Sequence, residues 1–256
     1  MESVEQKLHM THEMKECPQH GPYMAFRIRN SDDTYTPWGR CPKCQTGEPA
    51  QQIKPQPVID QQKVEQIQAT KQQQRLFDAD IPEKHKDSTF ANFVVTEQAH
   101  LDAIQACYDL LDGQLKSLLL IGPTGVGKTH LACASIRAAV ERDKTARWVK
   151  EKQLIGSLLE AMGERIGGDQ AVLRNYASYD LLVIDEIGKK PMSDFEANAL
   201  FDLIDERWGA SRPTIYIGNV TGTDFKAHFT DPMRSRIGDK GAWRRLTGKD
   251  YRESAV

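Results

Sequence analysis

The stretch LLLIGPTGVGKTHLACASI, Leu118–Ile136, decides the fold of this 256-residue chain. Its apolar start predicts a strand over Ser117–Ile121, and the apolar spacing after the glycines predicts a helix over Lys128–Val140. Between them stands GPTGVGKT, Gly122–Thr129, with the spacing G-x-x-x-x-G-K-[ST]. Backbone N–H groups of such a loop, and the helix start behind it, attract phosphate, so the stretch predicts a nucleotide site.

The loop assigns roles to individual side chains. Lys128 is expected to reach the β- and γ-phosphates, and the Thr129 hydroxyl is expected to bind Mg²⁺. The residues expected to contact the nucleotide are Gly122, Pro123, Thr124, Gly125, Val126, Gly127, Lys128, Thr129, His130 and, further along the chain, Asp185. The loop alone does not distinguish an ATPase from a GTPase or a small-molecule kinase.

An apolar strand that ends in two carboxylates, LLVIDE at Leu181–Glu186, favours hydrolysis. Asp185 at the strand end can hold Mg²⁺, and Glu186 can orient or deprotonate the attacking water. Asn219 follows another predicted strand, Pro213–Gly218, and is expected to bond the γ-phosphate or the water. The expected catalytic residues near the loop are therefore Lys128, Glu186 and Asn219.

Short apolar strands alternate with amphipathic helices over the C-terminal two thirds of the chain. A strand is predicted over Ala146–Lys150, a helix over Lys152–Met162, and a third strand over Tyr179–Asp185. A further helix opens at Ser193, because Glu196 three residues later completes a capping box. This alternation predicts an α/β fold with a parallel sheet covered on both faces.

Two short cysteine motifs near the N-terminus predict a zinc site. Cys17-Pro-Gln-His20 and Cys41-Pro-Lys-Cys44 each place two ligands two residues apart, so a tight turn can aim both at one ion. The intervening residues can form a hairpin around Asp32 and Asp33. A segment this short has too little apolar area to fold alone, so the zinc is expected to be structural.

The region after the cysteine motifs is rich in glutamine. Ten of residues 51–74 are Gln and apolar positions are sparse, so this region cannot build a core. It is either a linker whose second half, from Asp60, forms a solvated helix, or a helix that binds a partner. The sequence thus suggests three parts: a zinc-binding module over residues 1–45, a Gln-rich segment over 46–80, and an ATPase domain over 81–256.

Composition limits the remaining possibilities. The chain has 34 Lys and Arg against 36 Asp and Glu, so nucleic-acid binding would need a local patch rather than a global field. No apolar run is long enough to span a bilayer, and no signal peptide is recognised, so we expect a cytoplasmic protein with no membrane contact. Cys107 and Cys133 lie in apolar helical stretches and are expected to be packing residues.

Together these motifs resemble the AAA+ ATPases of the DnaC and IstB-like group, which contains helicase loaders and transposition helpers. The likeness rests on IPEKHKDSTFANF (Ile81–Phe93), the phosphate loop, YDLLVIDEIG (Tyr179–Gly188), RPTIYIGN (Arg212–Asn219) and DPMRSRIGDKGAWRRLTGKDYRES (Asp231–Ser254). It implies a doubly wound parallel sheet and a homo-oligomer that binds ATP at subunit boundaries. No C-terminal helical lid is recognised, so ATP turnover is expected to be slow and stimulated by partners.

The resemblance also implies an arginine that one subunit supplies to the γ-phosphate held by its neighbour, where it offsets charge in the transition state. Arg236 matches the family position best and Arg234 is the second choice. A surface arginine paired with Asp231 or Asp239 is the alternative interpretation.

DNA contacts have several candidates. Trp243-Arg-Arg245 places an aromatic side chain beside two cations, a combination suited to stacking and phosphate contact. The segment Lys150–Tyr176 either faces DNA or forms an ordinary pair of crossover helices. Its candidate contacts are Lys150, Lys152 and Arg165.

The leading functional prediction is an ATP-driven loader that carries a replicative helicase onto single-stranded DNA. In that case the zinc module and the Gln-rich segment would bind the helicase, as the resemblance implies for the region before the ATPase. A transposition helper of the IstB type is one alternative. Another is a zinc-dependent nucleic-acid-binding module whose nucleotide site acts only as a switch, favoured by Arg27, Arg29, Tyr35 and Trp38.

Overall fold

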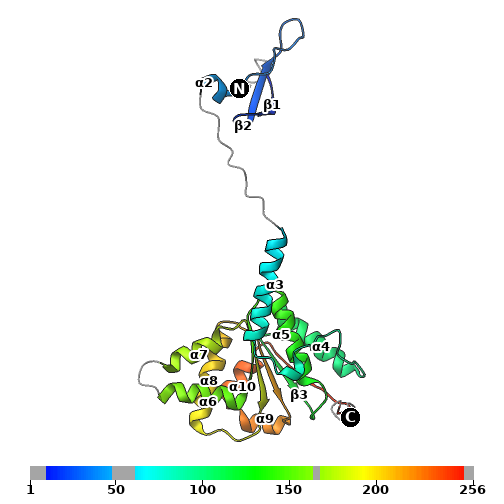
Figure 1. The fold of residues 1–256 in the computed structure, drawn as a ribbon, viewed down its shortest axis with the longest axis vertical. Helices are drawn as coiled ribbons and strands as arrows, with labels where there is room; N and C mark the ends of the chain where they lie inside the picture. The colour runs from blue at the N-terminus through cyan, green and yellow to red at the C-terminus, as the bar shows by residue number, and fades with distance from the viewer. Residues whose placement is uncertain (1–9, 48–60, 164–167, 251–256) are drawn as a thin grey trace, which may run out of the picture. The chain divides into compact units, whose positions relative to one another are not determined.

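The computed structural model describes residues 10–47, 61–163 and 168–250, which belong to two compact units, Met1–Asp60 and Gln61–Val256 (Figure 1). Helix α3 (Gln61–Asp78) belongs to the second unit, where it contacts α5 and β4. Most of α3 is exposed, which agrees with its glutamine content. The structure therefore groups this helix with the second unit, whereas the sequence suggested a separate segment over 46–80.

The first unit is a two-stranded hairpin followed by a single helical turn. Strands β1 (Met10–Cys17) and β2 (Gly21–Ile28) are antiparallel, and α2 spans Pro42–Thr46. The hairpin expected around Asp32 and Asp33 is reduced to one bridge, between Arg29 and Tyr35. The main ladder instead joins β1 to β2, and the turn of the first cysteine motif connects these two strands.

The second unit alternates strands and helices, and this confirms the α/β class. After α3 its elements are η1 (Glu83–His85), α4 (Gln98–Leu111), β3 (Ser117–Ile121), α5 (Lys128–Glu141), β4 (Ala146–Lys150), α6 (Glu151–Gly163), α7 (Gly168–Ser178), β5 (Leu181–Ile187), α8 (Asp194–Gly209), β6 (Thr214–Gly218), α9 (Gly222–His228), α10 (Asp231–Gly238) and β7 (Gly241–Arg245). Within the described ranges, no helix combines the length and apolar content needed to cross a bilayer.

The five strands form a parallel sheet in the order β4-β5-β6-β3-β7. One face packs its alternate side chains against α4 and α5, and the other packs against the group of helices from α6 to α10 (Figure 1). The sheet is thus doubly wound, as the resemblance implied. Because the strands are parallel, the phosphate loop after β3, the carboxylates at the end of β5 and Asn219 after β6 meet at one edge of the sheet.

Helix α8 is fixed at both ends. The expected capping box is present at its start, where the Ser193 hydroxyl accepts from the Glu196 N–H and the Glu196 carboxylate accepts from the Ser193 N–H. Near its end, Arg207 is 2% exposed and donates to the carbonyl oxygens of four residues and to one hydroxyl. These acceptors are Tyr176 (3.0 Å), Ala177 (3.2 Å), Tyr179 (2.8 Å), Pro213 (2.7 Å) and Thr214 Oγ1 (2.9 Å).

Candidate functional site

The phosphate loop joins β3 to α5 through glycines that close packing requires. Gly127 has φ +92°, and a Cβ there would lie 2.5 Å from the Phe93 ring. Gly122 has φ +143°, and a Cβ there would lie 2.1 Å from the carbonyl oxygen of Leu246. The glycines therefore let Phe93 and Leu246 pack directly on the loop, in addition to exposing its backbone N–H groups.

The side chains at the start of α5 bond the phosphate loop and the end of β5. Lys128 Nζ donates to the loop carbonyl oxygens of Gly122 (2.7 Å) and Pro123 (2.5 Å). Thr129 Oγ1 donates to Asp185 Oδ2 at 3.1 Å, so the two expected magnesium ligands lie together. A hydroxyl and a carboxylate are hard oxygen donors, which fit Mg²⁺.

The two adjacent carboxylates of β5 have different surroundings. Asp185 is 7% exposed, and burial raises its pKa against the opposing effect of hydrogen bonds from the Glu186 N–H and the Thr129 hydroxyl. Partial burial acts to raise the pKa of Glu186 too, but the ammonium groups of Lys189 (3.0 Å) and Lys150 (3.2 Å) lower it overall. Lys150, expected as a DNA contact, thus pairs with the expected catalytic carboxylate.

Glu186 owes its direction to a bulge. Its φ is +63°, in the left-handed region that side chains rarely adopt. Ile184 of β5 pairs with Tyr216 of β6, whereas Ile187 pairs with Gly218, so β5 contains one extra residue here. The extra residue turns Glu186 out of the strand alternation and leaves Asp185 buried beside Thr129.

These groups surround one cavity of about 600 Å³, the usual size of a small-molecule site. Its walls are the phosphate loop, the end of β5, Asn219 after β6, and part of the segment 81–93. Asn219 is exposed and lines the cavity. His130 also lines it and shares a hydrogen bond with the Thr89 carbonyl oxygen at 2.9 Å, which ties the segment 81–93 to α5.

Neither candidate arginine lines this cavity. Arg236 lies on α10, and its Nε donates to Asp205 Oδ1 of α8 at 2.7 Å. Arg234 donates to the carbonyl oxygens of Lys226 and Phe229 and pairs with Asp231. The pairing of Arg236 with Asp231 or Asp239, considered from the sequence, is not present; Asp205 takes that place, and no local motif signals it.

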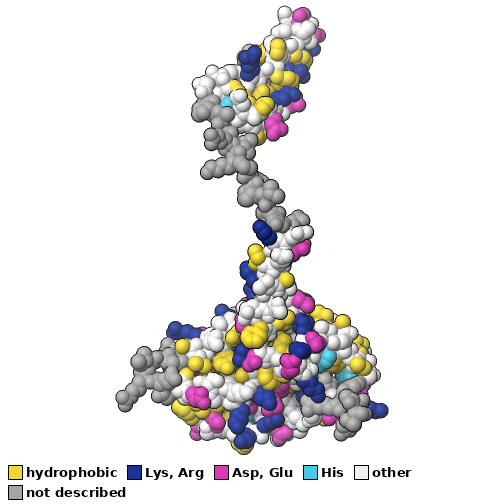
Figure 2. Space-filling model, in the orientation of Figure 1, with side chains coloured by type: hydrophobic (Ala, Val, Ile, Leu, Met, Phe, Trp, Pro, Cys, Tyr) yellow, Lys and Arg dark blue, Asp and Glu magenta, His cyan; other side chains and the backbone are white. Residues whose placement is uncertain are grey.

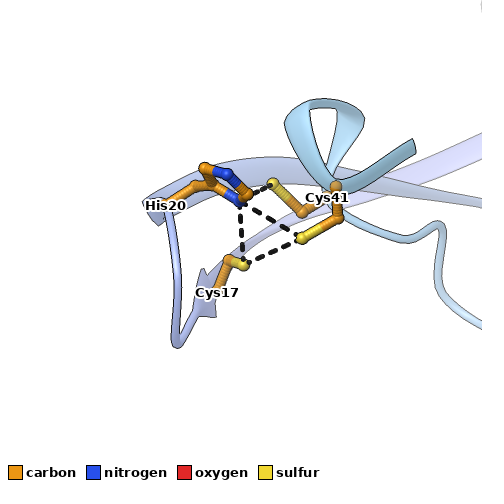
Figure 3. Close-up of side chains that lie close together, drawn as sticks. Cys17, His20 and Cys41 are labelled. Carbon is orange, nitrogen blue, oxygen red and sulfur yellow. Dashed lines mark hydrogen bonds between the residues drawn. The ribbon is translucent and has the colours of Figure 1, made fainter. Parts of the chain in front are cut away.

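The four predicted zinc ligands converge in the first unit. Their ligand atoms, from Cys17, His20, Cys41 and Cys44, all lie within 4.8 Å of one another. Figure 3 shows Cys17, His20 and Cys41 turned toward a common point, with Cys17 Sγ 3.6 Å from His20 Nδ1 and Cys41 Sγ 3.8 Å from it. Bond lengths of about 2.0–2.3 Å in a tetrahedron put neighbouring ligands about 3.4–3.8 Å apart, so the cluster fits a zinc ion.

Two thiols of the cluster have pKa values shifted in opposite directions. A hydrogen bond from the Gln19 backbone lowers the pKa of Cys17 to about 6, which favours the thiolate form that binds metals. Cys44, whose sulfur lies 3.5 Å from that of Cys17, has a pKa raised to about 11 because it hydrogen-bonds to Cys17. Three of the four ligands are buried, and Cys44 is exposed.

The hairpin has two unlike faces. On one, the Arg27 guanidinium lies over the rings of Tyr35 (4.3 Å) and Trp38 (4.4 Å), so these residues, considered as DNA contacts, are engaged with one another. The other face is apolar and exposed; it comprises Met14 of β1 and Met24, Phe26 and Ile28 of β2. Figure 2 shows hydrophobic side chains interspersed with Lys and Arg along this unit.

The C-terminal DNA candidates belong to the edge strand β7, which divides them. Successive side chains of a strand point to opposite faces, so Trp243 and Arg245 share a face and Arg244 does not. The Trp243 ring packs on Phe225 at 4.3 Å, and Arg244 Nε donates to the Asp102 carbonyl oxygen of α4. Of the crossover candidates, Lys152 is exposed on α6 and Arg165 lies outside the described residues.

The parallel sheet, phosphate loop and paired carboxylates define an AAA+ nucleotide-binding protein. The chain belongs to the family of IstB-like ATP-binding proteins, whose family model matches residues 56–239. The chain is similar to a protein of insertion sequence IS232 of Bacillus thuringiensis subsp. berliner, to which it is 36% identical over 120 residues. That match covers 46% of each protein, so the chain spans about half the length of this relative.

A second relative matches over more of its length. The replicative helicase loader DnaC of Escherichia coli K12 is 26% identical over 200 residues, which cover 72% of this chain and 80% of the loader. Among solved structures, the DnaC helicase loader superposes with a TM-score of 0.58 at 20% identity, over 65% of this chain and all of that one. The DnaA protein of Aquifex aeolicus superposes with a TM-score of 0.56 at 20% identity, over 68% of this chain and 52% of that chain. These superpositions show a shared AAA+ fold.

Proposed function

We propose that this protein hydrolyses ATP between neighbouring copies of itself and uses the cycle to load a replicative helicase onto single-stranded DNA. The observation that carries the proposal is the extent of the match to the DnaC loader, which covers 72% of this chain and 80% of that protein. The match to the insertion-sequence relative is closer in identity but covers a smaller part of the chain.

In the proposed reaction, the phosphate loop and Lys128 bind the triphosphate, and Thr129 and Asp185 hold Mg²⁺. When bound, the metal would supply positive charge that offsets the negative charge of the phosphate oxygens. Glu186 takes the role of the base that orients and deprotonates water, and its lowered pKa keeps it ionised at neutral pH. Asn219 hydrogen-bonds the γ-phosphate or the water, and Arg236 of a second copy completes the site.

The zinc module is the proposed grip for the helicase. A structural zinc at the four-ligand cluster would fix the turn between β1 and β2. The exposed apolar face of the hairpin then suits a protein surface better than a nucleic acid, because DNA-binding faces need cations and the neighbouring Arg27 is already stacked. DNA contacts in this proposal fall to the second unit, with Arg245 and Lys152 as the exposed candidates.

A transposition helper is the second candidate, and the family match and the IS232 relative favour it. Purified chain should be tested with the replicative helicase and with an IstB-type transposase partner from its own host. A loader should co-elute with the helicase from a size-exclusion column. It should also increase helicase binding to circular single-stranded DNA in the presence of ATP. Co-elution with the transposase and not with the helicase would replace the first proposal with the second.

Three variants test the chemistry. Lys128→Ala should abolish ATP hydrolysis and loading, and Glu186→Gln should bind ATP but stop the cycle. Loading that proceeds unchanged with Glu186→Gln would favour a nucleotide switch without hydrolysis. A mixture of Lys128→Ala and Arg236→Ala chains should partly recover hydrolysis, because the first donates its arginine to the intact site of the second; no recovery at any ratio would contradict catalysis between copies.

A further inference from the structure

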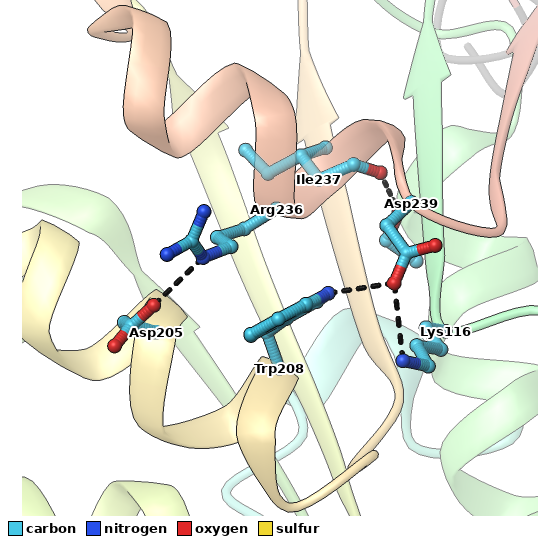
Figure 4. Close-up of polar contacts among 7 residues, drawn as sticks. Lys116, Asp205, Trp208, Arg236, Ile237 and Asp239 are labelled. Carbon is cyan, nitrogen blue, oxygen red and sulfur yellow. Dashed lines mark hydrogen bonds and ion pairs between the residues drawn. The ribbon is translucent and has the colours of Figure 1, made fainter.

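Arg236 is one of five charged or aromatic side chains that gather where α8, α10 and the start of β3 meet. The others are Lys116, Asp205, Trp208 and Asp239 (Figure 4). Every hydrogen bond in the cluster joins elements far apart in sequence, since Arg236 and Asp205 are 31 residues apart and Lys116 and Asp239 are 123 apart. The cluster lies apart from the nucleotide cavity, because none of its members lines that cavity.

Two neighbours hold the Arg236 guanidinium. Its Nε donates to Asp205 Oδ1 at 2.7 Å, and its Cζ lies 4.6 Å from the centre of the Trp208 ring. Asp205 and Trp208 are three residues apart on α8, so they lie on the same side of that helix. A hydrogen bond at one edge and a ring against the plane together fix both the position and the direction of the guanidinium.

Trp208 is held in turn by the rest of the cluster. Its Nε1 donates to Asp239 Oδ2 at 2.7 Å, and the same oxygen accepts from Lys116 Nζ at 3.1 Å. Figure 4 shows the Trp208 ring edge-on between Arg236 and Lys116, with Asp239 at its nitrogen. The adjacent Arg207 anchors the end of α8 in the core.

The outer end of Arg236 remains available. A guanidinium has five N–H donors, of which four are on its two terminal nitrogens. Within the described part of the chain, Asp205 is the sole hydrogen-bond acceptor for Arg236, and it uses Nε. The side chain is 30% exposed, and two terminal nitrogens side by side are the arrangement that binds two oxygens of one phosphate. Arg234 instead donates to two carbonyl oxygens and pairs with Asp231.

We propose that Asp205 and Trp208 are positioning residues that hold Arg236 ready for the γ-phosphate of a nucleotide bound by a second copy of this chain. The inference rests on the proposed function, in which Arg236 acts between copies. A free arginine side chain loses rotamer freedom when it binds phosphate, and a guanidinium already held by Asp205 and Trp208 loses less. The two residues therefore act on the rate in the neighbouring copy and not on their own nucleotide site.

The test uses two chains with separate tasks. The acceptor chain is Arg236→Ala, which has an intact nucleotide site but no arginine to donate. The donor chain is Lys128→Ala, which lacks a working site but keeps Arg236. Hydrolysis in the mixture then reports on the donor's arginine at the acceptor's site, and it is measured as a single-turnover rate with ATP and Mg²⁺.

Substitutions are placed on one chain at a time. Trp208→Leu on the donor should slow the mixed rate about tenfold, the size expected when a contact that holds a cation against an indole ring is lost. Trp208→Phe, which keeps a ring face, should lose less than about threefold. Asp205→Ala on the donor should also slow the rate, and Asp205→Asn, which keeps the acceptor oxygen, should restore most of it.

The same Trp208→Leu change on the acceptor is the matched control, because that chain has no Arg236 to position. It should leave the mixed rate within about twofold. Equal slowing from either chain would show a general structural effect and overturn the inference. A donor that lacks Arg236 and still supports hydrolysis in the mixture would instead refute catalysis between copies. A Trp208→Leu donor that supports the same mixed rate as its parent would refute only the positioning role.

Discussion

Replacing Arg207 with methionine tests the main anchor of α8. Among the described residues no carboxylate pairs with the buried guanidinium. Its charge is met by carbonyl oxygens, two of them from Tyr176 and Ala177 near the end of α7. The last carbonyls of a helix have no partner within it and carry its negative end, so Arg207 acts as a cap for α7. Burial lowers the pKa of Arg207 to about 10, and it is still protonated at neutral pH.

The expected cost follows from what the substitution leaves behind. Arg207→Met removes one donor from four carbonyl oxygens and from the Thr214 hydroxyl. Ala177 keeps its bond from Arg212 and Pro213 keeps its bond from the Leu182 N–H, whereas each of the other three acceptors costs about 1–3 kcal/mol if it stays buried without a partner. Water entry and relaxation reduce the sum, so we expect a loss of about 3–5 kcal/mol, the range seen when one partner of a buried charge contact is removed. With a denaturant slope of about 2–3 kcal/mol per molar, the urea midpoint should fall by about 1.5 M.

The assay is urea unfolding followed by circular dichroism at a helix-sensitive wavelength. Arg207→Lys should show about half of the loss, because one ammonium cannot reach all of the acceptors. Arg142→Met, which removes an exposed ion pair with Asp112, is the control and should cost less than about 1 kcal/mol. A midpoint for Arg207→Met within about 0.3 M of that control would refute the account of Arg207 as the anchor.

Three further outcomes are expected. Metal analysis should find about one zinc per chain. Cys41→Ser, which removes a buried member of the cluster, should lower that zinc content several-fold. A zinc content that does not change would exclude the cluster as the zinc site. Lys150→Ala should raise the pKa of Glu186, because one of its two neighbouring cations is lost. The acid limb of the ATPase pH profile should therefore move to higher pH. An acid limb that stays in place or moves to lower pH would contradict Glu186 as the titrating base. Gly127→Ala should weaken ATP binding, measured by calorimetry, by at least about tenfold, because the new Cβ strains the backbone and meets the Phe93 ring. Adding Phe93→Leu should recover only part of the lost affinity. Affinity equal to that of the parent would show that the loop adjusts freely.

Much of the second unit could be predicted because its signals are local. Strands β3 and β4 have the bounds expected from short apolar runs, and the capping box at Ser193 marks the start of α8. The phosphate loop and the two carboxylates are motifs whose flanking elements fix where they lie, since all parallel strands deliver their ends to one edge. The contact of Thr129 with Asp185 follows from that geometry.

The contacts that the sequence did not reveal depend on tertiary packing. No periodic pattern links Asp205 and Trp208 to Arg236, because the elements that carry them meet only after β6 and α9 have been placed between them. The edge strand β7, with the sequence GAWRR, lacks a clear alternation of apolar and polar residues, so its residues suggested a basic patch and not a strand. Strand β1, MTHEMKEC, was missed for the same reason.

The bulge in β5 limits how its pair of carboxylates can be transferred to another protein. Ile184 and Ile187 pack in the same hydrophobic cluster although they are three residues apart, which a regular strand does not allow. An engineer who grafts Asp185 and Glu186 onto a regular strand of another protein would keep both side chains but turn one of them toward the wrong layer. The transferable unit is the strand end together with its extra residue and the left-handed backbone of Glu186.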